Sequence, residues 1–267
     1  MQVDTRRASK ITLALLTPFI FASSALAQPA PAAAPVAVEA ADQKRNPAFD
    51  TWADKFSADW VRLSPERATS SQYFSGAEQL ALDRQLSPQT RAHRQKYLVM
   101  ARNGITRLDR FLAGKLDANQ RISAQTMRWS LANTVANEPF EDHAFTFSQF
   151  SGAHISLVTF MTETHPIRNA ADVDSYLARL AQVGTRLDEA TARARSAAGR
   201  SLIPPRFILE RAQGQVDAFL KPAPEQNVLV TSLAERSAKL ADLAPQAGAA
   251  DIASATAIDA GKIRPAY

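Results

Sequence analysis

The amino-acid sequence predicts an all-α protein, folded as a single helical bundle of about eight helices. The composition supports this class, because alanine is frequent, glycine contributes only 9 of the 267 residues, and runs of β-branched residues are few. Apolar residues recur at three- and four-residue steps, which is the spacing of one helical face. Prolines and glycines divide these periodic stretches and mark the expected helix ends.

The first 27 residues have the pattern of a signal peptide. Arg6, Arg7 and Lys10 precede a short apolar stretch, and Ala25-Leu26-Ala27 fits the small-residue rule for a cleavage site. The apolar stretch has about a dozen residues, too few to span a bilayer. We therefore expect an exported protein, periplasmic or extracellular, without an integral membrane segment in the mature chain.

Residues 28–46 are rich in proline and alanine, which predicts a disordered tether, and the helical domain is expected over residues 47–267. The chain contains no cysteine, so it has no disulfide and no thiol nucleophile. Its net charge is +5, but the cations alternate with acidic residues along the helices. Without a dense cationic cluster, we expect no nucleic-acid partner.

In the first half of the domain, proline-preceded caps and aromatic spacing define the helices. The aromatic residues from Phe49 to Trp60 share one face of the first helix, and Ser64-Pro65 has the pattern of an N-cap followed by proline. Residues 71–86 are expected to form a loop. A later helix is expected to present Trp129 and Leu131 on its apolar face. The expected helices of this half are 47–63, 64–70, 87–114 and 123–137.

The second half begins with a stretch that alternates like a strand. Because Phe145 and Phe147 alternate with polar residues, residues 140–152 are expected to form an ordered loop or a short β-hairpin arm. His165-Pro166 ends the next helix, and Asn169 has the pattern of an N-cap for a long one. The expected helices of this half are 153–161, 169–198, 204–220, 229–243 and 249–265.

No catalytic motif is present in the sequence. Zinc hydrolases place two histidines one helical turn apart with a carboxylate between them, and none of the four histidines has this spacing. The G-x-S-x-G elbow of serine hydrolases, the phosphate-binding glycine loop and the dinucleotide fingerprint are also missing. The sequence therefore assigns no catalytic residue, no metal ligand and no cofactor.

Three residues are candidates for lining a cleft: Gln149, Phe150 and His165. The amide of Gln149 can donate and accept hydrogen bonds toward a peptide, or it can satisfy backbone groups of its own loop. A His-Pro pair at a helix junction commonly caps or packs, and a ligand-facing role is the alternative for His165.

The central stretch Phe145–Leu180, FTFSQFSGAHISLVTFMTETHPIRNAADVDSYLARL, resembles the secreted bacterial proteins of the domain-of-unknown-function 885 family. The opening FDTWADKFSADWVRLSPERAT, the pair Arg128-Trp129 and the phrase Ile203-Pro204-Pro205 are also similar to it. The resemblance covers about residues 47–267. It implies a helical fold similar to that of zinc peptidases.

The resemblance also implies that a part of the family pattern is missing. In that family a zinc-binding His-Glu helix and a Gly-His-His phrase lie in the second half, and this sequence has neither. It therefore resembles the N-terminal half only and looks truncated. Zinc is expected only if the missing C-terminal half is supplied.

Two hypotheses about function follow. In the first, the chain is the N-terminal half of a peptidase-like protein, not catalytic alone, whose partners are a peptide substrate or a complementary C-terminal polypeptide. In the second, it is a stand-alone periplasmic module that binds peptides or proteins. Apolar faces left uncovered by a missing half would also lead to self-association.

Overall fold

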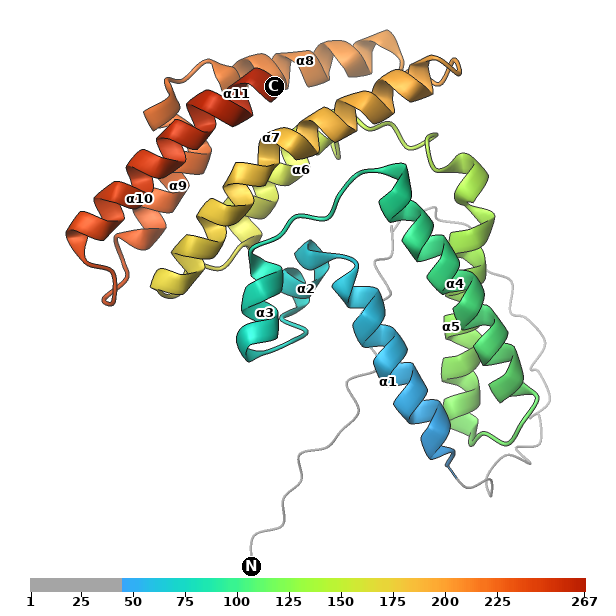
Figure 1. The fold of residues 1–267 in the computed structure, drawn as a ribbon. Coiled ribbons are helices and arrows are strands. Elements are labelled where there is room, and N and C mark those ends of the chain that lie inside the picture. The colour runs from blue at the N-terminus through green and yellow to red at the C-terminus, as the bar shows by residue number, and fades with distance from the viewer. Residues whose placement is uncertain (1–44) are drawn as a thin grey trace, which may run out of the picture.

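The computed structural model describes residues 45–267, and in this part of the chain every regular element is a helix (Figure 1). The predicted all-α class is confirmed. The predicted signal peptide and nearly all of the predicted tether lie outside the described residues. The α-helices are α1 (Pro47–Arg62), α2 (Pro65–Ser71), α3 (Gly76–Asp83), α4 (Arg91–Leu112), α5 (Ala118–Ala136), α6 (Ala153–Thr159), α7 (Ala170–Ala198), α8 (Arg206–Leu220), α9 (Val228–Ser237), α10 (Pro245–Ile258) and α11 (Arg264–Ala266).

Short 3₁₀ and π-helical segments join or extend several of these helices. The 3₁₀ turns are Glu138–Phe140 and Pro224–Gln226, and the π-helical turns are Phe160–Thr164, after α6, and Asp259–Ile263, between α10 and α11. No helix within residues 45–267 is long and apolar enough to cross a membrane.

The helices bury two apolar clusters rather than one. The first lies among α1, α4 and α5, on the right of Figure 1. Phe49 of α1 is buried there and meets Phe111 of α4 edge-on, with ring centroids 5.4 Å apart. Asn46 caps α1 by accepting the N–H groups of Ala48 and Phe49. The aromatic stripe of the first helix therefore faces a core, as its spacing predicts.

The second cluster is organised by α7, against which α6, α9, α10 and the π-helical turn Asp259–Ile263 pack (Figure 1). The side chain of Asn169 accepts the N–H of Asp172, so the predicted N-cap is present. The hydroxyl of Tyr176 donates to the carbonyl of Leu229 at 2.7 Å and joins α7 to α9. The buried apolar residues of α7 in this cluster are Val173, Tyr176, Leu180, Val183 and Leu187.

The two clusters meet through α2 and α3, which lie between them in Figure 1. The sequence predicts a loop where α3 forms. Gln79 and Asp83 are buried in α3, so polar residues occupy its inward face and hide the apolar period. The predicted start at Ser87 is also wrong: Thr90 caps α4, and the N–H of Ser87 donates instead to the Glu66 carboxylate at 3.0 Å.

Helix α5 differs from its prediction in two ways. It begins at Ala118, five residues before the predicted start, because Asp117 and Gln120 form a capping box. Trp129 is 67% exposed, so its predicted place on the apolar face is wrong. The buried face of α5 carries Ala124 and Leu131, and Trp129 lies well away from it around the helix.

Residues 141–152 form an ordered loop, which is one of the two predicted alternatives. The N–H groups of Gly152 and Ala153 donate to the carbonyls of Ser148 and Thr146, each at 3.0 Å. Arg193 of α7 contacts Asp142 at 2.7 Å, and Arg200 pairs with the same carboxylate. Burial raises the pKa of Asp142, but the hydrogen bonds from Arg200 and Arg193 outweigh it and hold that pKa below its usual range.

Helix α7 approaches the π-helical turn Asp259–Ile263 most closely at Gly184. A Cβ atom placed there would lie 2.5 Å from the carbonyl oxygen of Lys262, closer than real Cβ contacts allow. The obstructing atom belongs to the backbone and cannot rotate away. In contrast, a Cβ placed on Gly214 of α8 would have no atom within 4 Å.

We expect Gly184→Ala and Gly214→Ala to change stability in opposite directions. Gly184→Ala should lower the free energy of unfolding by about 1–3 kcal/mol through overpacking. Gly214→Ala should raise it by about 0.5–1 kcal/mol, because alanine favours the helix. Urea unfolding followed by far-UV circular dichroism measures both, and a loss of stability in both variants would contradict the described packing.

Candidate functional site

The loop residues Gln149 and Phe150 face α8 across an open hollow of about 600 Å³. Arg211, Gly214 and Gln215 of α8 form its other side. Phe150 is 87% exposed, so its ring stands at the edge of the hollow with most of its surface in water. The structure therefore brings two of the three sequence-predicted candidates together, and it adds three residues from a helix about 60 positions further along the chain.

Gln215 fixes the distance between the loop and α8. Its Nε2 donates to the carbonyl of Gln149 at 3.1 Å, and its Oε1 lies 3.1 Å from Nε2 of His154. Since this amide oxygen only accepts, Nε2 of His154 carries the proton and Nδ1 is bare. Burial lowers the pKa of His154, opposed by the hydrogen bond that its ring donates to Gln215.

Arg211 is the only charged residue among those that line the hollow. It forms no hydrogen bond or ion pair with any residue in the described part of the chain. The residues one helical turn away on either side are Phe207, Ile208, Gly214 and Gln215, and none is acidic. Arg206 of the same helix, by comparison, pairs with Glu210 at 2.7 Å.

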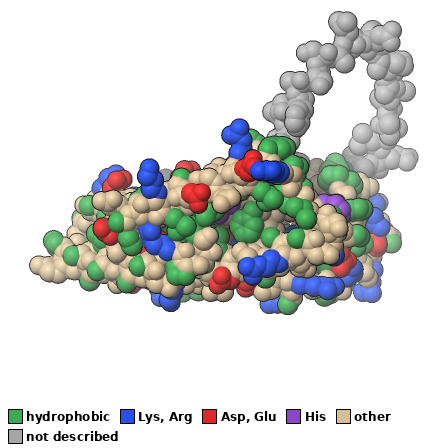
Figure 2. All heavy atoms as spheres, turned by 90° about the horizontal axis from the view of Figure 1, so that it is seen from above, with side chains coloured by type: hydrophobic (Ala, Val, Ile, Leu, Met, Phe, Trp, Pro, Cys, Tyr) green, Lys and Arg blue, Asp and Glu red, His purple; other side chains and the backbone are tan. Residues whose placement is uncertain are grey.

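Apolar side chains continue the hollow along α8. Phe207 lies one turn before Arg211 on the same face and is 58% exposed, and Ile203 just before the helix is similarly exposed. Ala212 is the one fully buried residue of α8. Figure 2, which views the molecule from above Figure 1, shows basic, acidic and hydrophobic side chains interspersed on the face turned to the viewer, without a field of a single sign.

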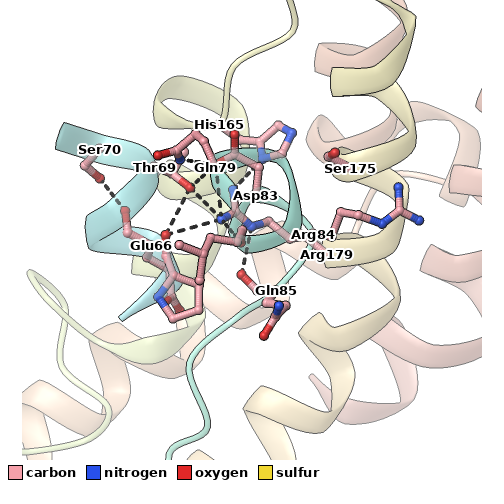
Figure 3. Close-up of polar contacts among 12 residues, drawn as sticks. Glu66, Thr69, Ser70, Gln79, Asp83, Arg84, Gln85, His165, Ser175 and Arg179 are labelled. Carbon is pink, nitrogen blue, oxygen red and sulfur yellow. Dashed lines mark hydrogen bonds and ion pairs between the residues drawn. The ribbon is translucent and has the colours of Figure 1, made fainter. Parts of the chain in front are cut away.

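His165, the third candidate, lies in the interior and does not line this hollow. Its ring is fully buried, Nδ1 is 2.7 Å from Nη1 of Arg179, and Nε2 is 3.2 Å from the carbonyl of Asp172 (Figure 3). Because Arg179 can only donate, Nδ1 accepts and Nε2 carries the proton. Burial, together with the charge of Arg179, lowers the pKa of His165 to about 4.

Arg179 itself is fully buried and was not singled out by the sequence. Its Nε donates to the carbonyl of Gln85 at 2.9 Å, and its Nη2 donates to the carbonyl of Leu82 at 2.9 Å. Nη2 also donates to the hydroxyl of Thr69 at 2.6 Å, and that hydroxyl donates to Asp83 (Figure 3). Burial lowers the pKa of Arg179 to about 10, opposed by Asp83, and the side chain stays charged at pH 7.

Arg236 of α9 reaches the same junction from the other side. It donates to the carbonyls of Met161 and Thr162, each at 3.2 Å, and to that of His165. These carbonyls end the π-helical turn Phe160–Thr164 and would otherwise lack a donor. His165 is thus held through its ring by Arg179 and through its backbone by Arg236, which gives it a structural role.

The described residues do not fit a zinc ion. Among residues 45–267, no group of three or more His, Cys, Asp or Glu side chains lies close enough together to hold a metal. Both ring nitrogens of His165 and one of His154 are engaged in hydrogen bonds.

A second hollow of about 590 Å³ lies between α1 and α4. Its lining is mainly apolar and includes Trp52, Phe56, Val99 and Met100. Lys96 and Asp59 both line it, so its charges are balanced.

We expect His165 to make stability depend on pH. Its pKa is about 4 in the folded protein and about 6.5 in the unfolded chain, so below pH 6.5 the unfolded chain binds a proton that the folded protein does not. The free energy of unfolding should fall by about 1.4 kcal/mol per pH unit as the pH drops from 6.5 to 4, and this contribution should stay constant above 6.5.

The variant His165→Gln tests this expectation. A glutamine amide can accept from Arg179 and donate to the Asp172 carbonyl, but it does not titrate. Urea unfolding of both proteins at several pH values gives the difference in slope. Equal slopes for the wild type and the variant between pH 6.5 and 4 would contradict the assigned neutral imidazole.

Comparison with solved structures finds a similar fold. A crystal structure described as that of "the putative lipoprotein from Colwellia psychrerythraea" aligns with a TM-score of 0.62 at 17% sequence identity. The alignment covers 80% of this chain and 39% of the other, so this chain spans well under half of that protein's length. At this identity the likeness shows a shared fold alone.

A search of curated proteins gives no match. The model of a family described as "Bacterial protein of unknown function (DUF885)" matches residues 65–267. The matched residues run from the start of α2 to the last residue and include the central loop, α7 and α8. They make up well over half of the chain, and the protein therefore belongs to the DUF885 family of bacterial proteins.

Proposed function

We propose that this chain is a non-catalytic part of an exported, peptidase-like protein, and that its task is to hold a peptide segment. The hollow between Phe150 and α8 carries the proposal. It combines an exposed aromatic ring, a cation without a partner among residues 45–267 and two amide side chains, and these groups bind peptides through apolar contact, charge and hydrogen bonds.

The polar interior supports a structural rather than a chemical role for the buried titratable groups. The ring nitrogens of His165 and the donors of Arg179 are used to join helices. Asp83 accepts from Thr69 and Gln79 in the same network. A general base or a nucleophile needs a group that faces substrate, and this network faces the core.

Export is supported by the sequence and by the solved relative. Residues 1–27 have the basic, apolar and small-residue regions of a signal peptide. The similar structure from Colwellia psychrerythraea is described as a lipoprotein, a class of exported proteins. The peptidase-like character rests on the resemblance of the central stretch and is part of the proposal.

A complementary C-terminal polypeptide is the second candidate for the partner. It is favoured by the length of the solved relative, of which this chain covers 39%. It is also favoured by α8, in which Ala212 is the one buried residue while Phe207 and Leu209 are exposed by 58% and 40%. The same surface could join two copies of this chain, and size-exclusion chromatography over a range of concentrations distinguishes self-association from a monomer.

The purified mature chain, residues 28–267, is expected neither to bind zinc stoichiometrically nor to cleave peptides. The physical reason is that its described histidines and carboxylates do not converge. Elemental analysis after dialysis against zinc, together with a quenched-fluorescence peptide library, measures both properties. One tightly bound zinc per chain with peptide cleavage would contradict the proposal.

The double variant Gln149→Ala, Phe150→Ala is expected to lose peptide binding. Removal of a large aromatic contact that becomes buried on binding weakens affinity by about tenfold or more. Fluorescence anisotropy with peptides selected on the wild-type protein measures the change. Trp129→Ala is the matched control, because it removes an exposed aromatic side chain that lies on α5 outside the hollow. Equal losses in both variants would refute a site at the hollow.

A further inference from the structure

We infer that the hollow takes an acidic peptide segment, whose carboxylate pairs with Arg211 while a neighbouring apolar side chain packs on Phe150. This inference rests on the proposed peptide-holding function and specifies the chemistry of the occupant. Three independent features of the hollow lead to it.

The first feature is charge. The residues that line the hollow are Gln149, Phe150, Arg211, Gly214 and Gln215, and Arg211 alone is charged. No residue among 45–267 forms an ion pair or a hydrogen bond with Arg211. By contrast, Arg206, the first residue of α8, pairs with Glu210. A carboxylate that enters the hollow therefore meets one positive charge and no lining acid that would repel it.

The second feature is the apolar surface beside this charge. Phe150 stands on one side of the hollow, and Phe207 precedes Arg211 by one turn on the same face of α8. Aromatic residues, phenylalanine among them, and arginine are each enriched at protein interfaces. A peptide that carries an apolar residue beside an acidic one can use both groups at once.

The third feature is an acceptor without a donor. Oε1 of Gln149 is buried and has no hydrogen-bond partner among the described residues. A solvent-shielded acceptor without a donor is unfavourable, so a rotation of the Gln149 amide toward the hollow, where a peptide backbone N–H can donate to it, would be favoured on binding. A free inorganic anion or an isolated carboxylic acid lacks this donor, so a peptide segment fits the lining better.

Gly214 provides the space in which the segment lies. A Cβ placed there meets nothing within 4 Å, so a larger side chain at this position would point into open volume. Replacing glycine by leucine inside a helix also favours the helix. Gly214→Leu should therefore fill the hollow without unfolding α8. A loss of peptide binding in this variant would then result from the blocked hollow and not from unfolding.

The experiment uses an array of hexapeptides that each combine one large apolar residue with one glutamate, paired with the same peptide carrying glutamine. The mature wild-type chain is compared with Arg211→Gln and Gly214→Leu. Arg206→Gln serves as the matched control, since Arg206 is an exposed arginine of α8 outside the hollow. Thermal unfolding of each variant checks that it is folded.

We expect the wild type to bind glutamate peptides about fivefold more tightly than their glutamine partners, which corresponds to an exposed ion pair. The preference should disappear in Arg211→Gln and at high salt and should persist in Arg206→Gln. Gly214→Leu should lose binding to both peptides without a lower unfolding temperature.

Three results would overturn the inference in distinguishable ways. Equal binding of glutamate and glutamine peptides refutes the acidic occupant and leaves the proposed function standing. Absence of binding to any peptide refutes both. A dimer of the wild type that Arg211→Gln dissociates identifies a second copy of the chain as the occupant and refutes the peptide.

Discussion

The buried guanidinium of Arg179 is the interaction on which the arrangement of the helices depends. Transferring a charge into the interior is costly unless its donors are satisfied, and here they reach α2, the end of α3 and His165. Two of the acceptors are carbonyls at and just after the C-terminal end of α3, those of Leu82 and Gln85, where the helix dipole favours a cation. One side chain of α7 thus fixes the layer that joins the two apolar clusters.

This constraint also decides which polar groups are available to a ligand. His165 is held by Arg179 and Arg236, so it joins helices in the interior, while the loop that carries Phe150 stays on the surface. That loop is in turn tied to the second half of α7 through Arg193. The same long helix therefore positions the interior junction and, through Asp142, the start of the loop that leads to the edge of the hollow.

The chain belongs to the DUF885 family, and its fold aligns with 39% of a longer solved protein. The solved relative contains additional polypeptide beyond the part that aligns.

The sequence by itself determined the all-α class, the caps at Ser64 and Asn169 and the buried face of α7, because apolar period and capping depend on residues close together along the chain. Only the tertiary structure decided that α3 is a helix, because its inward face carries the polar residues Gln79 and Asp83 instead of apolar ones. These two residues stabilise the helix through a buried network, in which Asp83 accepts from Gln79 and Thr69 and lies 3.8 Å from Arg179. A mid-helix arginine has the same local pattern whether it is buried or exposed.

The candidate site, too, is in part predictable from the sequence and in part decided by the fold. The sequence singled out Gln149 and Phe150, because an aromatic and amide-bearing loop between helices is recognisable locally. It could not find Arg211, Gly214 and Gln215, which belong to an ordinary amphipathic helix and gain significance only from a loop some 60 residues earlier. It also could not separate an interior His165 from a ligand-facing one, because burial is set by contacts between distant segments, and these exist only in the folded chain.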